Sequence, residues 1–106
     1  MQVYLELALR LDSVEQELKR LQLWSNAAPS ETALQSQQPF CVDTLAFEQW
    51  LQFVMIPKFR QMIAESIPLP AQCAIAEMAE EAFKEIEGKE LVECIRAIDQ
   101  LITFGR

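Results

Sequence analysis

The stretch VYLELALRLDSVEQELKRLQLW, residues 3–24, decides how this chain folds. Its apolar residues recur at alternating spacings of three and four, which places them on one stripe of an α-helix. The stripe consists of Tyr4, Leu7, Leu11, Val14, Leu18 and Leu21. Leu5 and Leu9 are expected to widen this apolar side. The sequence therefore predicts a helix over residues 3–24 with one face buried.

Charged residues cover the other faces of this helix, in a number typical of a solvated surface. Two pairs of opposite charge are spaced four residues apart, which favours ion pairs along a helix. They are Glu6 with Arg10 and Glu15 with Lys19. Three heptads are also the minimum for a coiled-coil dimer, so a structural homodimer built on this stripe is one alternative. We favour packing within the chain, because the later helices need a partner.

Three further helices are predicted beyond a long polar loop at residues 25–39. The second spans 44–65, with Asp43 as its N-cap and a kink at Pro57, which cannot donate a backbone hydrogen bond. The third spans 73–86 and ends at Gly88, expected as a left-handed cap. The fourth spans 89–103. The sequence thus predicts one all-α domain over residues 1–106, a small four-helix bundle with its long loop between the first two helices.

The composition argues against most catalytic chemistry. Histidine is absent, which removes the common general base and the histidine-dependent nucleophile systems. The three cysteines, Cys41, Cys73 and Cys94, are widely spaced and predict neither a zinc site nor a disulfide framework. No cofactor-binding motif stands out. The first ten residues lack a signal-peptide pattern, so we expect a cytoplasmic protein. From the missing histidine and the cysteine spacing we expect that it is not an enzyme and binds no metal.

Negative charge is concentrated in one part of the chain. The net charge is −7, and residues 77–93 alone hold seven glutamates and two lysines, a net charge of −5. Such a surface repels nucleic acid and attracts basic proteins. Glu77, Glu80 and Glu81 are therefore candidate partner-binding residues. A solvated acidic face that serves only solubility is the alternative interpretation.

Large aromatic side chains near the long loop are the second group of candidates. Aromatic residues are enriched in the parts of protein interfaces that carry the binding energy. The candidates are Trp24, Phe40, Trp50 and Phe53, together with Asp43. A structural role in the core is the competing explanation for most of them. Phe53 lies off the apolar stripe of its helix and is expected to be exposed.

The order of several short motifs resembles the YqcC-like family, a group of small bacterial proteins without an assigned function. The motifs follow one another between residues 3 and 101. They are Trp24, Gln38-Pro39-Phe40, Asp43-Thr44, Trp50-Leu51-Gln52, Ile56-Pro57 and Leu69-Pro70. The resemblance implies a small helical bundle. It also implies an association with a tRNA pseudouridine synthase, because family members are often encoded beside one.

These observations favour a non-catalytic protein-interaction module whose partner has a basic surface, with a tRNA pseudouridine synthase as the implied candidate. Direct tRNA binding is the alternative, through five scattered cations. They are Arg10, Lys19, Arg20, Lys58 and Arg60. A sequence pI near 4.5 argues against that alternative.

Overall fold

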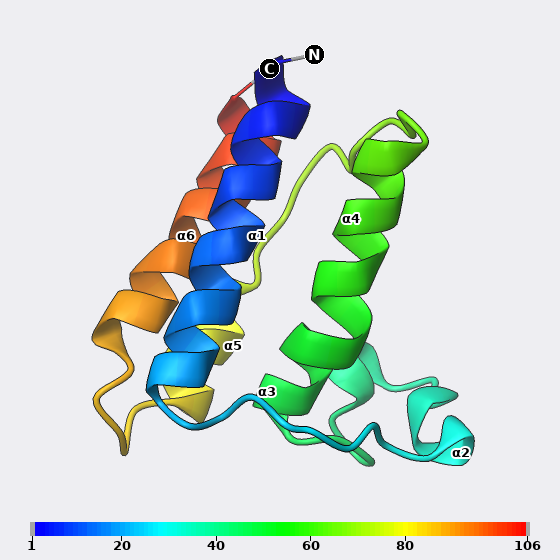
Figure 1. The fold of residues 1–106 in the computed structure, drawn as a ribbon, viewed down its shortest axis with the longest axis vertical. Helices are drawn as coiled ribbons and strands as arrows, with labels where there is room; N and C mark the ends of the chain where they lie inside the picture. Colours follow the sequence, from blue (N-terminus) through cyan, green and yellow to red (C-terminus); the bar gives the residue numbers. More distant parts are fainter. Residues whose placement is uncertain (1, 106) are drawn as a thin grey trace.

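The computed structural model of the chain describes residues 2–105, and all regular structure in that range is helical. The elements are α1 (Gln2–Arg20), α2 (Glu31–Leu34), a 3-10 turn η1 (Pro39–Cys41), α3 (Phe47–Trp50), a π-helical turn η2 (Leu51–Met55), α4 (Ile56–Ala64), α5 (Ala76–Ala82) and α6 (Lys89–Phe104). Figure 1 shows α1 and α6 side by side and antiparallel, with α4 as the third long rod. The all-α prediction is confirmed.

The prediction of a four-helix bundle is only partly correct. Three long rods form the domain: α1, the continuous run α3–η2–α4, and α6. The predicted third helix shortens to the seven residues of α5. Like charges spaced four apart, Glu77 with Glu81 and Glu81 with Glu85, weaken helix propagation there. The predicted loop 25–39 also contains a short helix, α2, whose N-cap Ser30 accepts a hydrogen bond from the Ala33 N–H at 3.1 Å.

The core forms where the stripe of α1 meets the other rods. Leu7, Leu11, Val14 and Leu18 are completely buried, as the spacing predicts. They pack in one cluster with the buried face of α6, which consists of Leu91, Val92, Ile95, Ile98 and Ile102. The expectation that Leu5 and Leu9 widen the buried side is wrong. These leucines are 65% and 59% exposed, because the core needs only the narrower stripe.

The second rod begins later than predicted and passes Pro57 through a π-helical turn. The Ile56 N–H donates to the Leu51 carbonyl five residues back, a wider turn than that of an α-helix. Pro57 follows at once and supplies no N–H of its own. The helix then continues to Ala64. The kink expected at Pro57 stays a prediction.

Two contacts hold the α4–α5 connection against the rest of the fold. The Tyr4 hydroxyl donates to the Ile67 carbonyl at 2.8 Å. At the far end, the Asp99 carboxylate of α6 accepts the backbone N–H groups of Ile75 and Ala76 at 2.7–2.9 Å. Asp99 thus performs the N-capping function for α5 from another helix, a role that sequence reasoning missed.

Gly88 does not have the left-handed conformation predicted for it. Its φ is −99°, and it is the N-cap of α6 rather than the C-cap of α5. Glycine is required at this position for another reason: a Cβ on residue 88 would lie 2.9 Å from the Cβ of Phe83. A glycine is needed there because the turn brings α6 close to the end of α5.

No helix within residues 2–105 is long and apolar enough to cross a membrane.

Candidate interaction site

The aromatic candidates Phe40 and Trp50 come together in one cluster. Their ring centroids are 4.8 Å apart in an edge-to-face arrangement, and Trp50 stacks on Phe47 at 5.7 Å. Phe47 in turn contacts Phe83, just beyond α5, at 5.7 Å. The cluster therefore joins the segment before α3 to the α5 region. Phe40 and Trp50 are half-buried against the core, so most of their surface serves packing.

The backbone at Phe40 shows how strongly this ring is held. Phe40 and Cys41 have φ values of +58° and +51°, in the left-handed region that non-glycine residues seldom adopt. Such a conformation costs free energy and persists only where surrounding contacts compensate. The contacts of Phe40 with Phe47 and Trp50, together with the burial of Cys41, supply that compensation.

Trp24 lies where the chain leaves α1 and enters the long loop. Its indole is half-buried against the core, and the Lys19 Nζ lies 5.2 Å from the ring centre, a cation–π contact. The following residue, Ser25, is held by a side chain that sequence reasoning overlooked. Gln52 Oε1 accepts the Ser25 N–H and Gln52 Nε2 donates to the Ser25 carbonyl, each at 2.8 Å. Gln52 is the buried polar residue among those the structure describes.

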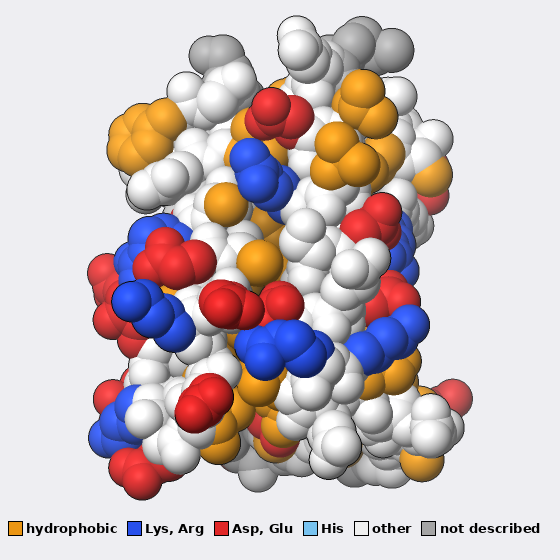
Figure 2. Space-filling model, turned by 60° about the vertical axis from the view of Figure 1, so that its left-hand side comes forward, with side chains coloured by type: hydrophobic (Ala, Val, Ile, Leu, Met, Phe, Trp, Pro, Cys, Tyr) orange, Lys and Arg blue, Asp and Glu red, His pale blue; other side chains and the backbone are white. Residues whose placement is uncertain are grey.

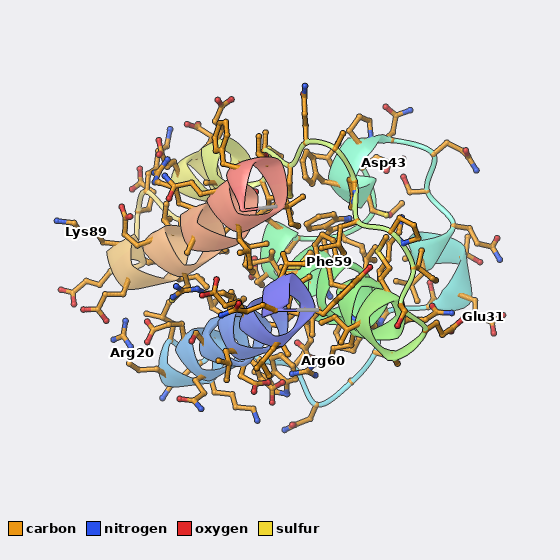
Figure 3. All side chains as sticks on the ribbon, turned by 90° about the horizontal axis from the view of Figure 1, so that it is seen from above. Arg20, Glu31, Asp43, Phe59, Arg60 and Lys89 are labelled. Carbon is orange, nitrogen blue, oxygen red and sulfur yellow. The ribbon has the colours of Figure 1, made fainter. Side chains whose placement is uncertain are left out.

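Asp43 does not cap the second rod. That rod begins at Phe47, and its first turn is supported by Gln49, whose Oε1 accepts the Ala46 N–H at 2.9 Å. Asp43 is exposed and accepts a hydrogen bond from the Ser36 hydroxyl instead. Figure 3 shows Asp43 on the outside of the molecule, in the segment that precedes α3. An aspartate before an apolar run has the same sequence signature in a loop turn as at a helix start.

Three side-chain contacts together close the long loop, and we call them the loop clasp. They are Gln52 with Ser25, Asp43 with Ser36, and the Thr44 hydroxyl with the Ala33 carbonyl at 2.6 Å. The clasp orders residues 25–45 against the second rod. The motif residues Asp43, Thr44 and Gln52 therefore have structural partners.

Phe53, expected to be exposed, is half-buried. It lies in η2, where the wider turn changes which side chains face outward.

The acidic candidates are exposed, but the structure partly neutralises them. Glu80 is ion-paired with Arg96, and Glu81 with Lys84 at 2.8 Å. Arg20 of α1 pairs with Glu17 at 2.8 Å and also reaches Glu90 at 3.4 Å, so two arginines from outside residues 77–93 offset part of the net charge of −5 there. Within residues 2–105, Glu77, Glu85 and Glu87 have no ion-pair partner, so they present the uncompensated charge.

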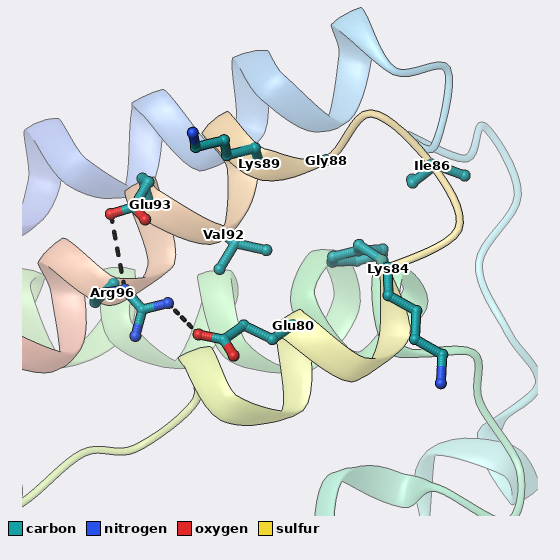
Figure 4. Close-up of a pocket in the computed structure, with 9 residues that line it drawn as sticks. Glu80, Lys84, Ile86, Gly88, Lys89, Val92, Glu93 and Arg96 are labelled. Carbon is teal, nitrogen blue, oxygen red and sulfur yellow. Dashed lines mark hydrogen bonds and ion pairs between the residues drawn. The ribbon is translucent and has the colours of Figure 1, made fainter.

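A shallow hollow of about 310 Å³ lies between α5 and α6 in this region. Figure 4 shows Arg96 bridging Glu80 and Glu93 on one side and Val92 facing the hollow. Three cations and two carboxylates line it: Lys84, Lys89, Arg96, Glu80 and Glu93. Because Lys84 is paired with Glu81, the remaining charges that line the hollow balance, and the unpaired glutamates lie outside this lining.

Burial changes the acidity of two of the three cysteine thiols. All three are free thiols, and burial raises the pKa of Cys73 to about 12, with a smaller contribution from its hydrogen bond to Asp99. Burial also raises the pKa of Cys94. Thiolates are the reactive form, so the Cys73 and Cys94 thiols are poor nucleophiles near neutral pH. The described part of the chain holds no group of three or more cysteine and carboxylate side chains placed to bind a metal.

Comparison with known proteins identifies relatives over nearly the whole chain. The family model DUF446, described as tRNA pseudouridine synthase C, matches residues 6–101. An uncharacterized protein of Haemophilus influenzae is 34% identical over 92 residues, 86% of this chain and 87% of that protein. The uncharacterized protein YqcC of Escherichia coli K12 is 36% identical over 75 residues, 71% of this chain and 69% of that one.

Two further matches are a solved structure and part of a longer protein. The solution NMR structure of E. coli YqcC superposes with a TM-score of 0.86 at 29% identity, covering all of this chain and 92% of the other. A protein of Pectobacterium carotovorum named tRNA pseudouridine synthase C is 33% identical over 60 residues. That match covers 57% of this chain but only 16% of the named synthase.

Proposed function

The chain belongs to the YqcC-like DUF446 family, and from this membership we propose that it is a non-catalytic protein-interaction module that acts as an accessory partner of a tRNA pseudouridine synthase. The observation that carries the proposal is the Pectobacterium match. A segment similar to this chain makes up 16% of a protein named as that synthase. More than half of this chain therefore has a similar counterpart within one polypeptide that bears the name of the proposed partner.

Two domains that occur on one polypeptide in one protein often contact each other, and covalent linkage explains why. Two domains on one polypeptide meet at an effective concentration in the millimolar range, so even a weak contact between them is occupied. When the same two domains are separate chains, they need a contact surface strong enough to form without the link. The proposal therefore requires a surface on this chain that suits the synthase.

The acidic surface around α5 meets this requirement. An enzyme that binds tRNA needs basic surface to contact phosphates. The unpaired carboxylates Glu77 and Glu85 attract such a surface and repel the RNA itself. The accessory chain would then contact the enzyme, and the enzyme would hold the RNA. The absence of histidine from the sequence and the poor reactivity of the Cys73 and Cys94 thiols fit a non-catalytic role.

A binding measurement with matched charge variants tests this proposal. Isothermal titration calorimetry would mix the chain with purified tRNA pseudouridine synthase C of the same organism at 50 and 300 mM salt. We expect binding that weakens with salt and weakens about tenfold or more in the Glu77→Lys/Glu85→Lys double variant. Glu31→Lys is the control, because Glu31 is exposed on α2, on the opposite side from Lys89 of α6 in Figure 3. Absence of binding at 50 mM salt would contradict the proposal.

Direct tRNA binding remains the alternative, but the structure weakens its support. Of its five candidate cations, Lys19, Arg20 and Arg60 are already ion-paired within the chain. In Figure 3, Arg60 extends from α4 toward α1, where it contacts Asp12 and Glu15. A gel shift with bulk tRNA at low salt is the direct test, and a clear shift would favour this alternative over the accessory role.

A further inference from the structure

Exposed apolar side chains gather at one end of the molecule, where α1 begins and α6 ends. The described residues include six large hydrophobic side chains that are exposed, and three of them lie here. Leu5 and Leu9 are on the outer face of α1, and Phe104, 81% exposed, is at the end of α6. Figure 2 shows hydrophobic side chains on either side of the upper part of this face, whereas charged groups dominate below. Leu5 and Leu9, spaced four residues apart, are neighbours on one face of α1 and form an apolar pair that faces solvent.

Two unpaired charges of opposite sign lie between these apolar groups. Glu6 and Arg10 were predicted to pair with each other, yet no ion pair forms between them, and within residues 2–105 neither is ion-paired elsewhere. Together with Phe104 they line a shallow groove of about 280 Å³ between α1 and α6. Both side chains are exposed and available to an external partner.

The spacing of these four α1 residues is self-complementary. When two copies of α1 cross antiparallel about a two-fold axis, residues whose numbers have a constant sum face each other. Leu5 opposite Leu9 of the second copy centres the contact at position 7, and Glu6 opposite Arg10 centres it at position 8. These centres differ by about 1.5 Å along the helix, which a flexible arginine side chain spans easily. A single two-fold axis therefore produces two Leu5–Leu9 contacts and two Glu6–Arg10 pairs.

We propose that this end of the molecule is a self-association surface, which two copies of the chain share through an isologous, antiparallel contact of their α1 helices. Leu5 and Leu9 form its apolar centre, and Glu6 pairs with Arg10 of the other copy on each side. A parallel contact is disfavoured because it would place Glu6 against Glu6 and Arg10 against Arg10. This contact differs from the homodimer that uses the heptad stripe, since that stripe is buried within the chain. It is also independent of any synthase.

Charge reversal provides a test that depends on the proposed pairing. Sedimentation velocity from 10 μM to 1 mM would follow the wild-type chain, Glu6→Arg, Arg10→Glu and an equimolar mixture of the two variants. Because the patch is small, we expect the wild-type dimer to form only in the upper part of this range. Each reversal alone places like charges opposite each other and should weaken dimerisation at least about tenfold. The mixture restores opposite charges across the contact and should dimerise again.

Two further variants separate this surface from others. Leu9→Lys should also yield a monomer, whereas Glu77→Lys, far along the chain on α5, should dimerise as the wild type does; circular dichroism would confirm that each variant is folded. A wild-type chain that is monomeric at 1 mM would overturn the proposal. So would a mixture of the two reversed variants that stays monomeric, or a dimer that survives Leu9→Lys. Binding of the synthase to this patch in place of a second copy would likewise appear as a monomeric free chain.

Discussion

Replacing Gln52 by leucine should destabilise the chain strongly, although the two side chains have similar volumes. The side chain is 7% exposed, and both of its polar atoms bind the backbone of Ser25 at 2.8 Å. Leucine has a similar volume, so little cavity forms. The loss is therefore that of two hydrogen bonds, each contributing about 1 kcal/mol net, plus the cost of the Ser25 groups left without partners. Since Ser25 is only half-buried, water offsets part of this cost, and we expect about 2–3 kcal/mol in total.

Urea unfolding followed by circular dichroism would measure this difference. A loss of that size should lower the melting temperature by about 8–20 °C in a domain of this length. Amide hydrogen exchange adds a local readout, because the Ser25 N–H should exchange slowly in the wild type and rapidly in Gln52→Leu. Gln37→Leu is the matched control, since Gln37 is an exposed glutamine of the same loop. A Gln52→Leu variant that unfolds within about 0.5 kcal/mol of the wild type would refute the reasoning.

Three other outcomes follow from particular contacts. Gly88→Ala should lower the free energy of unfolding by about 1–3 kcal/mol in urea, because the new Cβ would lie 2.9 Å from the Phe83 Cβ, an atom that no rotamer change can move away; an unchanged stability would show that the turn relaxes freely. Cys73, whose pKa is raised to about 12 chiefly by burial, should react with iodoacetamide at pH 8 at least about tenfold more slowly in the native chain than in urea, as mass spectrometry of its peptide would report; equal rates would mean that the thiol is accessible. Hydrogen bonds from Lys19 and Arg60 lower the pKa of Glu15, so its ion pairs stabilise the fold above the ordinary glutamate pKa, and this stabilisation is lost as the pH falls through the lowered value. Arg60→Ala should move the pKa of Glu15 upward in an NMR titration, and no movement would count against the pairing.

Periodicity predicted the parts of the fold that depend on neighbours along the chain. The buried residues Leu7, Leu11, Val14 and Leu18 follow directly from their spacing, because a helix turns that pattern into one face. The same reasoning from neighbouring residues failed where a helix cap and a loop turn have the same sequence pattern. Asp43 before an apolar run looks like a helix cap, yet it closes a loop turn with Ser36.

Contacts between distant residues could not be predicted in this way. Asp99 caps α5 from 23 residues further along the chain, and only the packing of α6 beside α5 brings them together. The charge of the acidic segment changed for the same reason. Arg20 comes from α1, so its pairing with Glu90 depends on the antiparallel arrangement of α1 and α6. A count along the sequence therefore overstated the negative surface.

The motifs by which the chain resembles its family turn out to describe how the long loop is held. Trp24 packs where the loop begins, Gln52 binds the next residue, Phe40 anchors the loop to Trp50, and Thr44 binds Ala33 across it. Gln52 is buried and Trp24 and Phe40 are half-buried, so these side chains have little free surface for a partner, whereas Thr44 is exposed. Substitutions at these positions would weaken binding simply by loosening the fold, whatever surface the partner uses.

Recognition is therefore better sought among exposed residues that the fold does not need. Two sets meet that condition: the unpaired carboxylates Glu77 and Glu85 near α5, and Leu5 with Leu9 on the outer face of α1. They differ in chemistry, one suited to a basic protein and the other to an apolar, self-complementary contact. Because they lie on different elements, charge variants of the first and leucine variants of the second can be combined in one chain. If the two surfaces act separately, each set of substitutions should abolish its own interaction and leave the other unchanged.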